Sequence, residues 1–107
     1  MAKKPKTLEV KLRSALRLIW SRSGERRAVL KAATFVDPLR GDKVFSCAIC
    51  TGVWPLWAAE VDHEPPIGSL EDWRDVTGFI QRMFFGPQRA VCKPCHRKKT
   101  AEQRRKK

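Results

Sequence analysis

The spacing of apolar residues predicts two helices in the first part of the chain. From Leu8 onward, apolar side chains recur at steps of three and four residues, which is the repeat of one helix face. This stripe consists of Leu8, Leu12, Ala15, Leu16 and Ile19. A second helix is predicted from Ser23, whose hydroxyl can cap its first turn, to Ala33, ahead of the helix-breaking Asp37-Pro38. We therefore expect a basic helical region over residues 8–43.

A different pattern follows in the middle of the chain. Residues 54–63 are short enough for strands and are stopped by Pro65 and Pro66, so this stretch is predicted to form two short strands in a hairpin. The strand that ends this stretch reads Ala-Glu-Val-Asp-His. The chain is therefore expected to combine helices with a small antiparallel sheet.

Helical spacing returns in the last third of the chain. Ser69, with Asp72 three residues later, resembles a capping arrangement, and a helix is predicted over residues 70–85, where Gly86-Pro87 ends it. Its large apolar side chains are expected to pack in the core rather than to bind a ligand. They include Trp73, Ile80 and Phe84. A last helix is predicted from about Pro94, because proline suits the first turn of a helix.

The length of the chain limits its architecture. At 107 residues it suits one domain with basic arms, expected over residues 1–7 and 103–107. Because so small a core leaves little margin for stability, an added staple such as a metal is expected. No apolar run approaches the roughly 18 residues that span a bilayer, and no signal peptide is recognisable. We expect a cytoplasmic protein with reduced thiols and no membrane partner.

The charge of the chain indicates the kind of partner. There are 23 Lys and Arg against 11 Asp and Glu, which gives a net charge of +12. Such an excess favours a polyanionic partner, and duplex DNA is the leading candidate. The basic residues of the two N-terminal helices fit either a DNA-gripping face or an ordinary solvated surface. Charge alone does not separate an enzyme from a binding protein.

All four cysteines lie in two C-x-x-C pairs, Cys47 with Cys50 and Cys92 with Cys95. In a reducing compartment such pairs indicate metal ligands rather than disulfides. Four thiolates complete the tetrahedral shell of a structural zinc ion. The pairs are separated by the 41 residues 51–91, more than the roughly 15–20 of a plain zinc ribbon, so a module is inserted between them. The functional site is expected in that insertion.

These segments resemble the HNH endonuclease family. The residues that carry the resemblance are the segments CAIC, VDHEPP and VCKPCHRKKT, within residues 44–102. The resemblance implies an α+β fold in which a zinc-bound ββα-metal hairpin and helix, the HNH nuclease module, packs against the N-terminal helices. It also implies a divalent-metal-dependent DNA endonuclease or nickase, a hydrolase of phosphodiester bonds. Small phage-encoded nucleases look like this, and a phage enzyme would act in the host cytoplasm.

The resemblance also implies roles for individual residues. His63 becomes the general base that activates water, while Asp62 and His96 hold one Mg²⁺ or Mn²⁺ at the scissile phosphate. The cysteines Cys47, Cys50, Cys92 and Cys95 bind the structural zinc. A positioned base typically contributes about 100- to 10,000-fold, and the cation neutralises charge on the phosphate. The residues expected to hold flanking phosphates are Lys93, Arg97, Lys98 and Lys99.

The sequence departs from the HNH family at the central residue of the motif, the one between the Asp-His pair and the last histidine. An Asn or His usually lies a few residues before the second cysteine pair, where this chain reads Gly86-Pro87-Gln88-Arg89, and the chain contains no asparagine. Gln88 or a backbone carbonyl could take its place, or catalysis could be lost. Two other interpretations fit the same sequence: a non-catalytic zinc-ribbon protein that binds nucleic acid, and an adaptor whose N-terminal helices bind an acidic partner.

Overall fold

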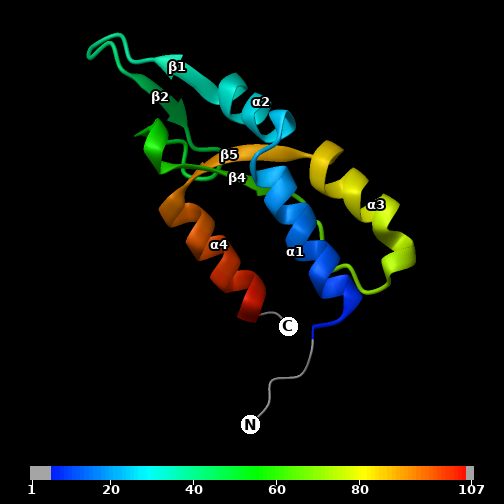
Figure 1. Ribbon diagram of the computed structural model, residues 1–107. Helices are drawn as coiled ribbons and strands as arrows, with labels where there is room; N and C mark the ends of the chain where they lie inside the picture. The colour runs from blue at the N-terminus through cyan, green and yellow to red at the C-terminus, as the bar shows by residue number, and fades with distance from the viewer. Residues whose placement is uncertain (1–5, 106–107) are drawn as a thin grey trace.

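Four α-helices and two small antiparallel sheets form residues 6–105, the part of the chain that the computed structural model describes (Figure 1). The helices are α1 (Leu8–Ser21), α2 (Gly24–Ala33), α3 (Val76–Ile80) and α4 (Lys93–Arg105). The strands are β1 (Thr34–Val36), β2 (Lys43–Ser46), β3 (Val53–Pro55), β4 (Ala59–His63) and β5 (Gln88–Cys92). The predicted α+β class is confirmed. Most of the basic arm expected over residues 1–7 lies outside the described residues.

The two N-terminal helices form where the apolar spacing and the Ser23 cap predict them. The Thr7 hydroxyl accepts a hydrogen bond from the Val10 N–H at the start of α1, and the Ser23 hydroxyl accepts one from the Arg26 N–H at the start of α2. The buried face of α1 differs from the predicted stripe, because Ile19 is 58% exposed and Trp20 packs inward in its place. Trp20 follows Leu12 and Leu16 at four-residue steps, so all three lie on one face.

The strands pair differently from the predicted hairpin over residues 54–63. Strand β3 pairs with β2, and β2 pairs with β1, whereas β4 joins the separate sheet with β5. A single helical turn, Leu56–Ala58, lies between β3 and β4 and directs the chain from one sheet to the other. The hairpin is therefore wrong in its pairing. The region 8–43 also holds β1 in addition to its two helices.

The third helical segment begins later than predicted. Asp72 is extended, with φ −135° and ψ 124°, and its carboxylate accepts a hydrogen bond from the Arg74 N–H, so the helix starts at Trp73 instead of Leu70. A 3₁₀ turn, α3 and a wider helical turn, Gln81–Phe85, follow one another up to Gly86. Trp73, expected in the core, is 52% exposed.

The sheet of β4 and β5 leads directly into α4. Asp62 pairs with Arg89 and His63 with Gln88 across the two strands, and α4 starts at the residue after β5. Helix α4 continues to Arg105, through most of the predicted basic tail; residues 106–107 lie outside the described part. Figure 1 shows α1, α3 and α4 extending from this sheet toward one end of the molecule, while β1 and β2 project from the other.

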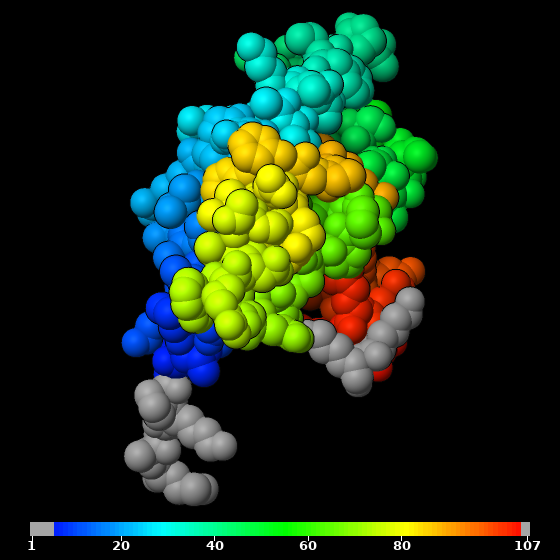
Figure 2. Space-filling model, turned by 90° about the vertical axis from the view of Figure 1, so that its right-hand side faces the viewer, coloured from blue at the N-terminus to red at the C-terminus, as the bar shows by residue number. Residues whose placement is uncertain are grey.

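Two separate groups of buried side chains form the core. The first surrounds the cysteines and consists of Phe45, Cys47, Ala58, Ala90, Val91 and Cys92. The second consists of Ile67, Leu70, Phe79 and Met83, and α1 covers it. Figure 2 views the molecule from the side of α3, where this helical segment lies beside α1. Within residues 6–105, no helix combines the length and the apolar character needed to cross a membrane.

The second core group gives a direct stability test. Phe79 is fully buried, so Phe79→Ala leaves a cavity in the core. We expect the free energy of unfolding to fall by about 3–5 kcal/mol. Phe85 lies in the same helical segment but is 72% exposed, so Phe85→Ala should change the free energy of unfolding by about 0.5 kcal/mol or less. Urea unfolding of both variants measures the difference. Equal losses would contradict this description of the core.

Candidate metal centre and catalytic cleft

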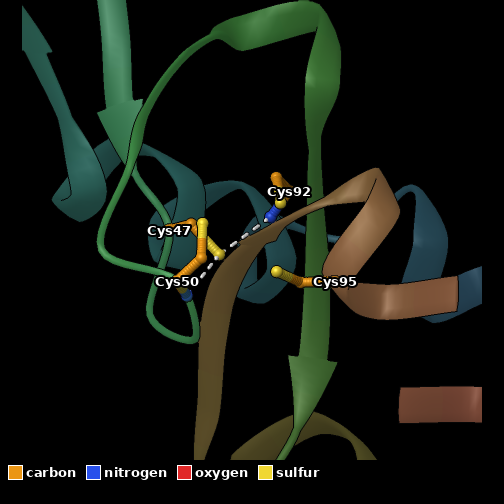
Figure 3. Close-up of side chains that lie close together, drawn as sticks. All are labelled: Cys47, Cys50, Cys92 and Cys95. Atoms are coloured by element: carbon orange, nitrogen blue, oxygen red, sulfur yellow. Dashed lines mark hydrogen bonds between the residues drawn. The ribbon is translucent and has the colours of Figure 1, made fainter. Parts of the chain in front are cut away.

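The four cysteines come together at the junction of the two sheets (Figure 3). Cys47 and Cys50 lie in the turn after β2, Cys92 ends β5, and Cys95 lies in the first turn of α4. Their four sulfur atoms all lie within 4.8 Å of one another. The predicted clustering of the two C-x-x-C pairs is therefore confirmed.

The turn that holds Cys47 and Cys50 is shaped to stabilise a thiolate. The Cys47 Sγ accepts hydrogen bonds from the backbone N–H groups of Ile49, Cys50 and Cys92, at 3.4, 3.5 and 3.3 Å. Burial opposes ionisation of this thiol, but the three N–H donors outweigh it and lower the pKa of Cys47 to about 6. A thiolate held by backbone N–H groups is the form in which cysteine binds a metal.

The thiols of Cys92 and Cys95 are held toward their neutral forms. The Cys95 thiol donates a hydrogen bond to Cys92, and this contact, together with burial, raises the pKa of Cys95 to about 12, while burial raises the pKa of Cys92. Four negative sulfurs this close would repel one another unless a positive ion were placed among them. Four sulfur donors and no other ligand fit a closed, structural zinc site. Such an ion would fasten the turn after β2 to the start of α4.

The structure brings Asp62 and His96 together on one face of the β4–β5 sheet. Asp62 Oδ1 lies 3.8 Å from the Nε2 atom of His96, which projects from the first turn of α4. Asp62 is only 6% exposed, so its carboxylate is held in a largely dry environment. Its other oxygen, Oδ2, accepts hydrogen bonds from Lys99 at 2.5 Å and from Arg89 at 3.1 Å. Oδ1 is therefore the oxygen that faces the imidazole.

His63 is held on the opposite side of β4 by the backbone. Its Nε2 atom lies 2.7 Å from the carbonyl oxygen of Met83, and its ring lies against Trp20 with 4.7 Å between the ring centroids. Because a carbonyl only accepts hydrogen bonds, Nε2 carries the proton and Nδ1 keeps a free lone pair. Burial lowers the pKa of His63, and the charges of Arg17 and Lys99 act in the same direction, which favours the neutral ring.

Of the two expected replacements for the missing asparagine, a backbone carbonyl contacts His63. Gln88 lies opposite His63 in the sheet, but its side chain has other partners. Its Oε1 accepts a hydrogen bond from the Trp20 indole at 3.0 Å, and its Nε2 donates to the Phe84 carbonyl at 3.0 Å. Gln88 therefore fixes the tryptophan that packs on the imidazole, while Met83 fixes the imidazole itself.

Asp62, His63 and His96 all line one hollow, of about 770 Å³, between α1 and α4. Helix α1 contributes Arg13 and Arg17 to its wall, and α4 contributes Arg104. Within residues 6–105, neither Arg13 nor Arg17 has a carboxylate within ion-pair distance. Burial, together with the charge of Arg13, lowers the pKa of Arg17. Two cations with no anionic partner make this wall suited to an anion.

The four basic residues expected at flanking phosphates occupy different environments. Lys99 is engaged in ion pairs with Asp62 and Glu64. The Nζ atom of Lys93 lies 5.8 Å from the centroid of the Trp57 ring. The other two, Arg97 and Lys98, are exposed and lie outside the lining of the hollow. The sequence showed the basic face of α1, but only the fold places its arginines beside His63 and His96.

Comparisons of the chain with protein-family models, with curated proteins and with solved structures found no match.

The zinc assignment predicts one zinc ion per chain in the purified protein. Cys95→Ser removes one of the four sulfur ligands, so we expect loss of tightly held zinc and a lower melting temperature. Ala48→Ser places the same hydroxyl in the exposed turn between Cys47 and Cys50 and should retain the zinc. Elemental analysis of the three proteins measures the metal. A wild-type protein without zinc would contradict the assignment.

Proposed function

We propose that the chain is a divalent-metal-dependent DNA endonuclease or nickase of the HNH type. The observation that carries the proposal is the shared hollow, in which a neutral imidazole with a free nitrogen lies near an aspartate–histidine pair. His63 is the base, and Asp62 and His96 are the cation ligands. Arg13 and Arg17 on the α1 wall, which have no ion-pair partner in the described part of the chain, provide the charge that a phosphate backbone would need.

The order of the elements supports this proposal. Asp62 and His63 end the first strand of an antiparallel pair, and the second strand leads directly into the helix that carries His96. The helical segment of residues 73–85 is inserted between the two strands, and the strands and the final helix keep the order that the HNH resemblance implies. The cysteine cluster lies where β5 becomes α4, so a bound zinc ion would fix the helix of His96 relative to the strands.

His63 has the geometry of a general base. The Met83 carbonyl holds the proton on Nε2, which leaves Nδ1 to take a proton from a water molecule as that water attacks the phosphorus. The lowered pKa keeps the ring neutral at neutral pH, the state in which it accepts a proton. A fixed tautomer also removes the cost of reorienting the ring during the reaction.

Asp62 and His96 suit a divalent cation. Their facing atoms, Oδ1 and Nε2, lie 3.8 Å apart, a separation that one ion with ligand distances of about 2.1 Å can bridge with little movement. Mg²⁺ or Mn²⁺ bound there would neutralise charge on the phosphate and on the leaving oxygen. Lys99 and Arg89 hold Oδ2 and so leave Oδ1 as the oxygen available to the ion.

A second candidate function rests on the same ion pairs. Lys99 and Arg89 already form ion pairs with the Asp62 carboxylate. An aspartate paired in this way can have a purely structural role, without binding a cation. The chain would then be a zinc-stapled protein that binds nucleic acid without cutting it. The two functions share the basic hollow and differ in cleavage, so the plasmid assay that follows separates them.

The endonuclease proposal predicts that the zinc-loaded protein nicks supercoiled plasmid when Mg²⁺ or Mn²⁺ is added. His63→Ala should lower the rate by about 100- to 10,000-fold, because no other group replaces the base. His63→Gln, whose amide can still donate to the Met83 carbonyl, should be equally slow while preserving that hydrogen bond. Gel analysis of the plasmid forms measures the rate. Nicking that survives both substitutions would remove His63 from the mechanism.

The hollow predicts which basic residues bind DNA. Arg17→Gln should weaken binding to duplex DNA and reduce the slope of log affinity against log salt by about 1, because one phosphate contact is lost. Lys98→Gln makes the same change of charge on an exposed position outside the hollow and should leave the slope nearly unchanged. Fluorescence anisotropy at several salt concentrations measures both. A larger effect from Lys98→Gln would place the DNA on another face.

A further inference from the structure

A third carboxylate, Glu60, contacts the imidazole of His96 on the side away from Asp62. Glu60 is paired with the Nδ1 atom of His96, while the Nε2 atom of the same ring faces Asp62 Oδ1. Glu60 and Asp62 are two positions apart in β4, so both side chains lie on the same face of the strand. The imidazole of His96 therefore lies between two carboxylates, with one ring nitrogen toward each.

The two carboxylates differ in their other partners. Asp62 Oδ2 is held by Lys99 and Arg89, whereas the Glu60 carboxylate is paired with His96. A carboxylate accepts a hydrogen bond from a neutral imidazole only at the nitrogen that carries the proton. Pairing with Glu60 therefore places the proton on Nδ1 and leaves the Nε2 lone pair toward Asp62.

We propose that Glu60 is a positioning residue, which fixes the Nδ1–H tautomer of His96 and turns Nε2 toward a divalent cation shared with Asp62. Histidines that bind metals generally donate their other ring N–H to a carboxylate or carbonyl, which fixes the ring and increases the basicity of the ligand nitrogen. This role rests on the proposed function, because it assigns a cation to the Asp62–His96 pair. Glu60 itself does not touch the reacting phosphate.

The proposal gives the two histidines of the chain opposite tautomers. His63 carries its proton on Nε2, because that atom donates to the Met83 carbonyl, whereas His96 carries its proton on Nδ1. The chain contains no other histidine, so each ring gives its own set of signals in a nuclear magnetic resonance spectrum. The tautomers can therefore be read in the intact, zinc-loaded protein without any divalent cation or DNA.

The first experiment records multiple-bond ¹H–¹⁵N spectra of the full chain labelled at histidine, at pH 8. The expected result is an Nδ1–H signal pattern for His96 and an Nε2–H pattern for His63. Glu60→Ala should move His96 toward the Nε2–H form common in free imidazole, and Glu60→Gln, which keeps an acceptor oxygen, should largely preserve Nδ1–H. An Nε2–H pattern for His96 in the wild-type protein would overturn the proposal.

The second experiment titrates the same proteins with Mn²⁺ and follows binding by calorimetry and by paramagnetic broadening of the His96 signals. Glu60→Ala should weaken Mn²⁺ binding by about 10- to 100-fold. Glu64→Ala is the matched control, because it removes the same charge from the same cluster but contacts Lys99 and Arg89 instead of His96. Glu60→Gln should bind Mn²⁺ more tightly than Glu60→Ala. If Glu60→Ala and Glu64→Ala weakened Mn²⁺ binding equally, Glu60 would contribute only its negative charge, and the proposal would be overturned.

These outcomes are separate from the plasmid assay. Mn²⁺ binding at His96 that depends on Glu60, in a protein that nicks no plasmid, would support the role of Glu60 and contradict the endonuclease function. The opposite outcome is a protein that nicks plasmid and in which Glu60→Ala changes neither the His96 tautomer nor the Mn²⁺ affinity. That outcome would support the endonuclease function and overturn the role of Glu60. A wild-type protein that binds no Mn²⁺ near His96 would overturn the role of Glu60 whatever the spectra show.

Discussion

The close approach of four cysteine sulfur atoms, all within 4.8 Å of one another, is the contact around which the fold is organised. Two pairs of cysteines, separated by residues 51–91, meet where the turn after β2 approaches the start of α4. Backbone N–H groups favour the thiolate of Cys47, whereas four thiolates this close would repel one another without a cation among them. Zinc bound there would hold together segments that no large core joins, since the buried side chains form two small groups.

The polar side of the β4–β5 sheet depends on that attachment. Asp62 is almost fully buried, so its charge must be satisfied by neighbours rather than by water. Lys99 and Arg89 meet one carboxylate oxygen, and His96 faces the other. Two of these three partners reside on α4, the helix that carries Cys95. A shift of α4 would therefore disturb the metal centre and the polar cluster together.

Helix α1 connects the second core group to the candidate cleft. Its inner face packs on the buried group around Phe79, and Trp20 at its end covers the ring of His63. Its outer face carries Arg13 and Arg17 into the wall of the hollow. Helix α1 is thus part of the candidate site, although the sequence analysis placed the predicted nuclease module in residues 44–102. The second core group and the basic wall of the hollow consequently share one element.

Features that depend on local chemistry could be predicted from the amino-acid sequence. Caps and spacing located α1 and α2, Gly86 marked the end of the third helical segment, and the two C-x-x-C pairs predicted the sulfur cluster. The strand pairing emerged only from the tertiary structure, because β4 does not pair with the neighbouring β3 but with β5, which follows α3 in the chain. The tertiary structure alone also revealed the Met83 carbonyl and Glu60 as the partners of the two histidines. A backbone carbonyl leaves no mark in a sequence, and a glutamate acquires its role only when a distant imidazole is folded against it.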